Sequence, residues 1–269
     1  MILSDTHTHS TFSHDGVSTA SEMALAARDS GLKCLYLTEH FDAYLTDPKN
    51  PRIRYFEDAI FAPHEALPED IEMPLSIELG EANECPDYCR ELLERHPYDF
   101  VLGSLHHLPG RKGFLSSTYS GREECEYLFD LYLDQLLFNA AETDYDSFAH
   151  IDYPLRYFYF NNGILLHLED RLSKLEELLS VIIRRGKALE LNTATLRKGY
   201  PTLMGDALAL FRSLGGEYVT IGSDAHETRH LSCNFKEAEE ACIKAGFDHY
   251  TLYRARKPRN ILFTASSID

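Results

Sequence analysis

Two histidines near the start of the chain, His7 and His9, are the first residues whose spacing suggests chemistry. They follow the apolar residues Ile2 and Leu3 in a run that reads Asp-Thr-His-Thr-His. Side chains alternate between the two faces of a strand, so residues two apart point into the same space. Neutral imidazole is a good ligand for zinc, manganese and iron. The pair suggests a site for one or two divalent ions, although an isolated His-x-His also describes two surface histidines.

The composition indicates one globular domain. The chain has 269 residues, 44% of them hydrophobic, which suits one domain of barrel size or two small ones. We find no linker, fixed repeat or low-complexity tract, so we expect a single domain over residues 1–269. With 26 basic against 43 acidic residues the net charge is -17, which disfavours nucleic acid and anionic lipid as partners.

Several signals point to a cytoplasmic protein. The chain has no apolar run long enough to cross a membrane and no basic, signal-like start. Its six cysteines are therefore expected to be reduced thiols. Cys85 and Cys89 are one helical turn apart, but their charged flanks indicate a solvated helix rather than a metal pair. No feature of the sequence indicates an oligomeric state.

Short apolar runs alternate with amphipathic helical patterns along the chain. Strands are predicted at residues 2–6, 33–38, 73–79, 99–104, 146–149, 188–191, 218–222 and 250–253. Helices are predicted at residues 19–31, 55–63, 86–95, 121–142, 168–185, 203–214 and 236–245. Seven or eight strand–helix units in one chain of this length favour a parallel α/β barrel with helices outside. An open three-layer sheet is the alternative.

Potential metal ligands stand at the downstream ends of these predicted strands. In a parallel barrel these ends meet at one rim, so residues far apart in sequence converge there. Together they offer more nitrogen and oxygen ligands than one ion needs, which favours two or three ions with bridging groups. They are His7, His9, His40, Glu78, His106, His150, Asn192, Asp224 and His226.

The motifs around these positions resemble those of the polymerase-and-histidinol-phosphatase (PHP) family, from residue 2 to about residue 262. Within the family, the chain resembles the monofunctional histidinol-phosphatases of histidine biosynthesis. None of the motifs is specific alone, but their combination is. They are Asp5-Thr6-His7-Thr8-His9-Ser10 with Asp15-Gly16, Thr38-Glu39-His40, Ile77-Glu78-Leu79-Gly80-Glu81, Gly103-Ser104-Leu105-His106, His150-Ile151-Asp152, Glu190-Leu191-Asn192-Thr193 and Gly222-Ser223-Asp224-Ala225-His226.

The resemblance implies a distorted, parallel, TIM-like (β/α)7 barrel with a centre of three divalent ions. Zinc, manganese and iron all accept this ligand set. One ligand position falls on Asp15, where some relatives carry histidine, and His14 is one residue away. The implied ligands are His7, His9, Asp15, His40, Glu78, His106, His150, Asp224 and His226.

The implied activity is hydrolysis of L-histidinol phosphate, a small phosphorylated amino alcohol, by attack of a metal-bridging hydroxide. Cationic side chains should hold the phosphate, and Arg197, Arg156 and Lys198 are the candidates. The acidic residues Glu39 and Asp42 would suit the ammonium and imidazole groups of the substrate. Asp152 and His230 are the candidates for protonating the leaving group or relaying that proton. The aromatic run 157–160 could stack on the imidazole, although such runs usually pack in a core.

Three other functions are compatible with parts of this pattern. A phosphodiesterase or nucleotide phosphatase of the same family would use the same metal ligands. An amidohydrolase also has a His-x-His on its first strand, but it usually bridges its metals through a lysine that the fourth predicted strand lacks. A scaffold protein with an inactive site is disfavoured because the implied ligands are all present.

Overall fold

The computed structural model describes residues 2–43, 68, 70–204 and 206–263. Its centre is a six-stranded parallel sheet with the strand order β3-β4-β5-β6-β7-β8. The strands are β3 (His40–Asp42), β4 (Ser76–Gly80), β5 (Phe100–Ser104), β6 (Ser147–Phe148), β7 (Ala188–Asn192) and β8 (Val219–Gly222). A second parallel pair consists of β1 (Ser4–Thr8) and β2 (Cys34–Leu37). The predicted α/β class with a parallel central sheet is confirmed.

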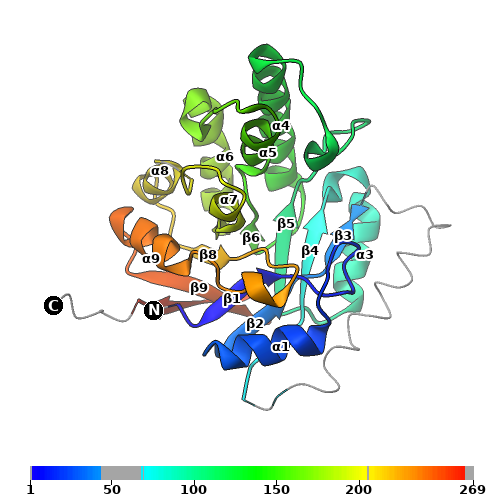
Figure 1. Ribbon diagram of the computed structural model, residues 1–269, viewed down its shortest axis with the longest axis vertical. Coiled ribbons are helices and arrows are strands. Elements are labelled where there is room, and N and C mark those ends of the chain that lie inside the picture. The colour runs from blue at the N-terminus through cyan, green and yellow to red at the C-terminus, as the bar shows by residue number, and fades with distance from the viewer. Residues whose placement is uncertain (1, 44–67, 69, 205, 264–269) are drawn as a thin grey trace.

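Helices surround the strands, which occupy the middle of the molecule in Figure 1. The helices are α1 (Ala20–Asp29), α3 (Pro86–Arg95), α4 (Arg122–Glu142), α5 (Tyr153–Asn162), α6 (Leu172–Arg184), α7 (Ala194–Arg197), α8 (Ala207–Ser213) and α9 (Phe235–Lys244). Short 3-10 turns are formed by Ala82–Glu84, Phe114–Ser116, Leu168–Arg171 and Thr228–His230. Helix α1 begins at a capping box, in which Thr19 and Glu22 bond each other's backbone N–H groups.

The parallel strands are buried on both faces. Every residue of β1, β4, β5 and β7 is buried, as expected of parallel strands covered by helices. A large apolar cluster packs the helices against the sheet, including Phe129, Leu136, Leu178 and Ile182. A separate, smaller cluster lies among the strands themselves and includes Tyr36, Phe100, Leu102, Ala188 and Tyr253.

Hydrogen bonds connect the β1–β2 pair to the larger sheet on both sides. At the β1 side, Asp224 N–H donates to the carbonyl of His7, and His9 N–H donates to the carbonyl of Ala225, each at 2.8 Å. At the β2 side, Leu35 N–H donates to the carbonyl of Glu72, just before β4, at 2.9 Å. The end of β1, which carries the two histidines, is therefore fixed beside the end of β8.

The predicted strand at 33–38 corresponds to β2, and a further short strand, β3, follows where none was predicted. Thr38 N–H still bonds the carbonyl of Thr8 in β1, and the chain then crosses to β4, where Glu78 N–H bonds the carbonyl of Glu39. His40 thus begins β3, where it pairs with Glu78 of β4. The predicted helix at 55–63 lies outside the described residues.

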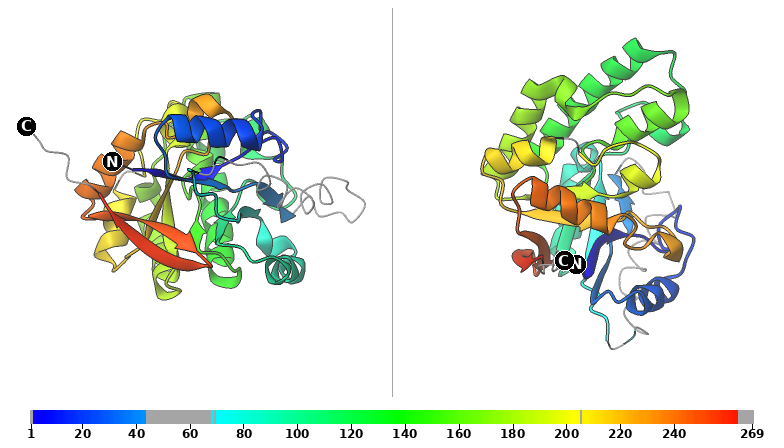
Figure 2. Two further views of the ribbon diagram at one scale, coloured as in Figure 1. Left: turned by 90° about the horizontal axis from the view of Figure 1, so that it is seen from below. Right: turned by 60° about the vertical axis from the view of Figure 1, so that its left-hand side comes forward.

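Besides β3, the elements α5, the short helix α7 and β10 were not predicted from the sequence. Helix α5 is rich in aromatic residues, which favour strands, and both of its faces carry buried side chains, so no helical period is visible. Strand β10 (Lys257–Leu262) contains proline and charged residues, which are typical of an exposed edge strand. It pairs antiparallel with β9 (His249–Arg254), on the side of the molecule away from α1 in Figure 2. None of the helices in the described ranges has the length and apolar character needed to cross a bilayer.

Candidate metal centre

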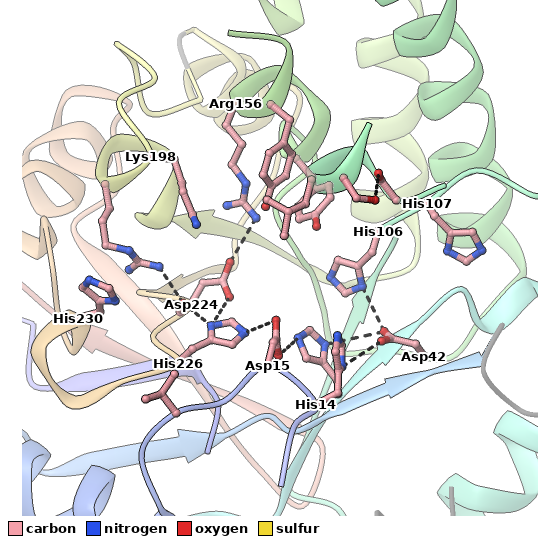
Figure 3. Close-up of a pocket in the computed structure, with 18 of the residues that line it drawn as sticks. His14, Asp15, Asp42, His106, His107, Arg156, Lys198, Asp224, His226 and His230 are labelled. Atoms are coloured by element: carbon pink, nitrogen blue, oxygen red, sulfur yellow. Dashed lines mark hydrogen bonds and ion pairs between the residues drawn. The ribbon is translucent and has the colours of Figure 1, made fainter. Parts of the chain in front are cut away.

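The carboxyl ends of the strands surround a cavity of about 480 Å³. Its walls come from segments that follow β1, β5, β6, β7 and β8, together with β3 itself. Figure 3 shows acidic and imidazole groups along one side and cationic side chains opposite them. The lining includes His14, Asp15, His40, Asp42, His106, His107, Tyr153, Arg156, Tyr157, Arg197, Lys198, Asp224, His226, Glu227 and His230.

His7 and His9 converge as the alternation of a strand requires. Their Nε2 atoms lie 3.0 Å apart, and both rings are fully buried. The Nδ1 atom of each ring has a partner behind it. The partner of His7 is Glu190 at 2.6 Å, and the partner of His9 is the hydroxyl of Ser13 at 3.1 Å. The Nε2 atoms therefore face the centre of the cluster.

Glu78, in the middle of β4, is surrounded by imidazoles. Its Oε1 lies 3.1 Å from Nε2 of His106 and 3.1 Å from Nε2 of His150. Its Oε2 lies 2.9, 3.3 and 3.5 Å from ring nitrogens of His40, His7 and His9, respectively. One buried carboxylate thus approaches five histidines that come from four different parts of the chain.

The segment after β8 adds an acid and another imidazole. Asp224 has a left-handed backbone (φ 52°), and its Oδ1 lies 3.7 Å from Nε2 of His7 and 3.5 Å from Nε2 of His9. The ring of His226 stacks on that of His9 with centroids 4.2 Å apart, and its Nε2 lies 3.1 Å from Asp15. Both polar side chains of this segment therefore contact His9.

The donor atoms of this cluster fit divalent cations. Ligand atoms lie within 4.8 Å of one another in each of four overlapping groups: His9, His40 and His226; His7, His9 and Asp224; His7, Glu78 and His150; His40, Asp42 and His106. Among the described residues, Glu78 Oε2, His40 Nδ1 and His226 Nε2 are buried without a well-aligned hydrogen-bond partner. Buried polar atoms normally have such a partner. Nitrogen and carboxylate atoms that converge without one are typical of a metal site.

Burial and the neighbouring charges shift the pKa values of the candidate ligands in both directions. Although burial lowers the pKa values of His7, His40 and His106, the nearby carboxylates raise them above the usual range, so a metal ion must displace their protons. Burial alone would raise the pKa values of Glu78 and Asp224, but the neighbouring histidines hold both well below the usual range. Burial lowers the pKa of His9, and the proximity of His40 and His226 lowers it further. The two carboxylates are therefore ionised and His9 is neutral at neutral pH, as metal ligation requires.

Arg156 faces this cluster from α5. Its guanidinium lies against the rings of Tyr153 and Tyr157, 4.5 and 5.3 Å from their centroids, and it is buried. Its Nη2 donates to Asp224 Oδ2 at 3.3 Å. Nε and Nη1 have no hydrogen-bond partner within the described ranges. Arg156 therefore has donors left for an anionic ligand in the cavity.

Three further cationic or titratable side chains complete this wall. Arg197 donates from its two Nη atoms to the carbonyls of Ser223 and Asp224, at 2.7 and 2.9 Å. It therefore fixes the segment that carries Asp224. Lys198 and His230 line the cavity beside it. Burial lowers the pKa of His230, and the charge of Arg197 lowers it further.

The family model described as PHP domain matches residues 5–194, which include β1 to β7. The chain belongs to the PHP family. Relatives named for histidinol-phosphatase activity align over nearly the whole chain. The probable histidinol-phosphatase of Clostridium acetobutylicum is 29% identical over 238 residues, 87% of this chain and 90% of that protein. The histidinol-phosphatase of Lactococcus lactis is 26% identical over 262 residues, 94% of this chain and 95% of that protein.

Two solved structures share the fold. The histidinol phosphate phosphatase of Lactococcus lactis, crystallised with zinc, L-histidinol and phosphate, superposes with a TM-score of 0.75 at 23% identity. The alignment covers 96% of this chain and 98% of that one. A putative histidinol phosphatase from Listeria monocytogenes gives a TM-score of 0.72 at 19% identity, covering 87% of this chain and 99% of that one.

The sequence left open whether Asp15 or His14 takes one ligand position of the PHP family, and the two side chains have different neighbours. Asp15 lies 3.1 Å from Nε2 of His226 and 3.6 Å from Nε2 of His40. His14 lies at the rim, with its Nδ1 4.0 Å from Asp42. The geometry favours Asp15. Asp42, predicted as a substrate contact, instead lies against Nδ1 of His106 at 3.2 Å and forms one of the ligand groups.

Two of the predicted site residues, Glu39 and Asp152, do not line the cavity. Glu39 accepts hydrogen bonds from the hydroxyls of Ser10 and Ser13, at 2.6 and 2.5 Å, so it supports the segment that holds His9 rather than a substrate. Asp152 is buried at the start of α5 and accepts from the hydroxyl of Thr195 at 3.0 Å. The geometry therefore gives no support to substrate binding by Glu39 or to proton transfer by Asp152.

Sequence reasoning overlooked two buried carboxylates of the site. Glu190 contacts His7, as described above. Asp5 accepts from the backbone N–H and hydroxyl of Ser223 at 2.9 and 2.5 Å, and from Ser232 N–H at 3.1 Å. Both acids stand inside strands whose other residues are all buried. A charged residue within a fully buried strand is costly unless it is paired, and this signal could have identified both.

Proposed function

We propose that this chain is a metal-dependent phosphomonoesterase that hydrolyses L-histidinol phosphate to L-histidinol and phosphate, a step of histidine biosynthesis. The observation that carries the proposal is a single cavity in which a cluster of metal-ligating side chains faces Arg156 and Arg197. The proposal combines membership of the PHP family with the histidinol-phosphatase activity for which the relatives are named. One solved relative contains zinc, L-histidinol and phosphate, which are the cofactor and products that this reaction would require.

The side chains present would bind three divalent ions, with zinc, manganese or iron as the candidates. The ligands we propose are His7, His9, Asp15, His40, Glu78, His106, His150, Asp224 and His226. Ions bound there activate water as a nucleophile at neutral pH and neutralise phosphate oxygens. Arg156 and Lys198 donate to the phosphate from the opposite wall, while Arg197 orients Asp224.

The rest of the substrate lies toward the acidic side of the cavity. The histidinol group carries positive charge, which the carboxylate of Glu227 on the cavity wall suits. Of the aromatic run 157–160, Tyr157 lines the cavity and is placed to contact the imidazole. Of the two predicted proton donors, only His230 lines the cavity. Its lowered pKa keeps it neutral at neutral pH, so we assign it a hydrogen-bonding role at the leaving oxygen.

The finer fold assignment is part of this proposal. We propose that the strands form the distorted (β/α)7 barrel of one domain spanning residues 1–269. Parallel bridges join Ala225, just after β8, to Thr8 of β1, and Cys34 of β2 to Glu72, ahead of β4, and they support the barrel. We also propose that the protein acts in the cytoplasm on a small molecule rather than on nucleic acid, in keeping with its net charge of -17.

The test is phosphate release by the purified protein, with bound metal quantified on the same sample. L-histidinol phosphate is compared with a nucleoside monophosphate and a phosphodiester, the substrates of the alternative PHP activities. A His9→Ala variant prepared in parallel controls for contaminating phosphatases. We expect rapid turnover of L-histidinol phosphate by the wild type only. A metal-loaded wild type that cleaves another ester but not L-histidinol phosphate would contradict the proposed substrate.

Substitution of the two arginines should separate their roles. We expect Arg156→Lys to lower kcat/KM about 10- to 100-fold, or ~1.4 to 2.8 kcal/mol, because lysine keeps the charge but loses the planar fork of donors. Arg197→Lys should cost less at the phosphate, because both Nη atoms of Arg197 are bonded to backbone carbonyls.

Steady-state kinetics on L-histidinol phosphate measure both effects. Arg122→Lys is the matched control, because that arginine is exposed on α4. If Arg156→Lys has the same kcat/KM as the wild type, the phosphate is bound elsewhere.

A further inference from the structure

Glu190, on β7, is a fully buried carboxylate with three polar neighbours, two of which come from distant parts of the chain. Its Oε1 lies 2.6 Å from Nδ1 of His7. Its Oε2 accepts from the backbone N–H of His150 at 2.9 Å and from the side-chain amide of Asn192 at 3.1 Å. Both oxygens are thus used, and both are used as acceptors.

The contact with His7 determines which ring nitrogen carries the proton. An ionised carboxylate can only accept a hydrogen bond, so Nδ1 of His7 must be the donor. In the neutral form of the ring, which a metal ion requires, the lone pair then lies on Nε2, the atom that is 3.0 Å from Nε2 of His9 and 3.3 Å from Glu78. A carboxylate behind a ligating imidazole fixes its tautomer and ring orientation and increases its basicity.

The contact with His150 stabilises an unfavourable backbone. His150 has φ 22°, a positive value that is uncommon for residues other than glycine. Such conformations persist only where the surroundings hold them. The bond from His150 N–H to Glu190 is one such restraint, and it fixes the residue whose Nε2 lies 3.1 Å from Glu78.

The neighbouring strand leaves room for this arrangement. A Cβ atom at Gly222 of β8 would lie 2.6 Å from Glu190 Oε1 and 2.3 Å from Cβ of His7. Glycine at this position therefore allows the carboxylate and the imidazole to meet.

We propose that Glu190 is the positioning residue of the centre: one carboxylate fixes the tautomer of His7 and the backbone of His150, so that both present Nε2 toward Glu78. The inference rests on the proposed function only in treating this cluster as a metal centre. It concerns metal binding and does not depend on the identity of the phosphate ester.

Glutamine at this position tests the idea because it has one acceptor and one donor group in place of two acceptors. If its NH2 faces His7, Nδ1 must accept, and the proton moves to Nε2, where metal would bind. If its NH2 faces the other way, it opposes the donors of His150 and Asn192. Neither orientation preserves all three contacts, whereas aspartate keeps two acceptors on a shorter side chain.

The experiment has two readouts other than activity. The first is zinc affinity, measured by chelator competition, for the wild type, Glu190→Gln and Glu190→Asp. The second is two-bond ¹H–¹⁵N correlation spectroscopy of zinc-loaded protein with ¹⁵N-labelled histidine, with His7 assigned by its loss in His7→Asn. Asp146→Asn is the matched control, because Asp146 is also a buried carboxylate but bonds Val101 N–H and Arg256 outside the cavity.

We expect the wild-type spectrum to show a proton on Nδ1 of His7. Zinc affinity should fall about 10- to 100-fold in Glu190→Gln, and less in Glu190→Asp. Asp146→Asn should melt at a lower temperature but bind zinc as the wild type does. An unprotonated Nδ1 in the wild type, or wild-type zinc affinity in Glu190→Gln, would overturn the inference.

These outcomes remain decisive if Glu190→Gln does not fold, because the wild-type spectrum and Glu190→Asp still test the claim. They also separate this inference from the proposed function. A wild type that binds zinc with the expected tautomer but releases no phosphate would refute only the function. A phosphatase whose zinc affinity is insensitive to Glu190 would refute only the role of Glu190.

Discussion

Replacing Glu78 with glutamine is expected to abolish most of the metal binding and lower kcat by about 1,000-fold, or ~4 kcal/mol. Glutamine keeps the size of the side chain but removes the negative charge that five imidazoles approach. The NH2 group of glutamine would replace one of the two carboxylate oxygens. It would then face either His106 and His150, which now contact Oε1, or His40, which now contacts Oε2. The substitution therefore replaces attraction with opposed donors at several ligands at once.

Metal content after desalting and phosphate release on the same sample measure this effect. Glu72→Gln provides the control, because it makes the same chemical change at a side chain that is 73% exposed. Circular dichroism should show that Glu78→Gln retains its secondary structure. Retention of the wild-type metal content and kcat in a folded Glu78→Gln protein would exclude this carboxylate from the centre.

Introducing a single methyl group at Gly222 should have the second largest effect. In Gly222→Ala the new Cβ would lie 2.3 Å from Cβ of His7 and 2.6 Å from Glu190 Oε1. Carbon atoms do not approach so closely, and the His7 contact lies next to the backbone, so β1 and β8 must separate. We expect a loss of about 1 to 3 kcal/mol in the free energy of unfolding. A ligand displaced by about 1 Å should also reduce kcat by about 100-fold.

Urea denaturation and kinetics of the same preparations test this prediction. Gly113→Ala is the matched control for stability, because a Cβ atom at Gly113 would meet open space. Both variants make the same substitution, so only Gly222→Ala should lose stability. If Gly222→Ala behaves like Gly113→Ala, β1 and β8 are not packed as closely as described.

The sequence by itself determined the local part of this site. His7 and His9 converge because a strand alternates its side chains, and this rule needs no tertiary information. His106, His150 and the pair Asp224 and His226 follow apolar runs, and parallel strands bring their ends to one edge. The α/β class and the choice of ligand types could therefore be predicted from periodicity and position alone.

The tertiary structure decided which of the neighbouring polar residues reach the cavity. Glu39 is adjacent in sequence to His40, yet it turns back to Ser10 and Ser13, while Asp42 lies against His106. Asp152 is two residues from His150 but is buried at the start of α5, away from the cavity. Adjacent residues of a strand point to opposite faces, and the start of a helix redirects the chain, so distance along the sequence does not give distance to the site.

The buried carboxylates show that residues far apart in the sequence can also be in direct contact. Glu190 contacts His7 although 183 residues separate them, and Asp5 contacts Ser223 across 218 residues. No local pattern encodes such pairs, because both depend on the register between strands, and the Glu190–His7 contact also depends on the space left by Gly222. The identity of the metal ligands is therefore a property of short motifs, while their tautomers, orientation and supports are properties of the packed strands.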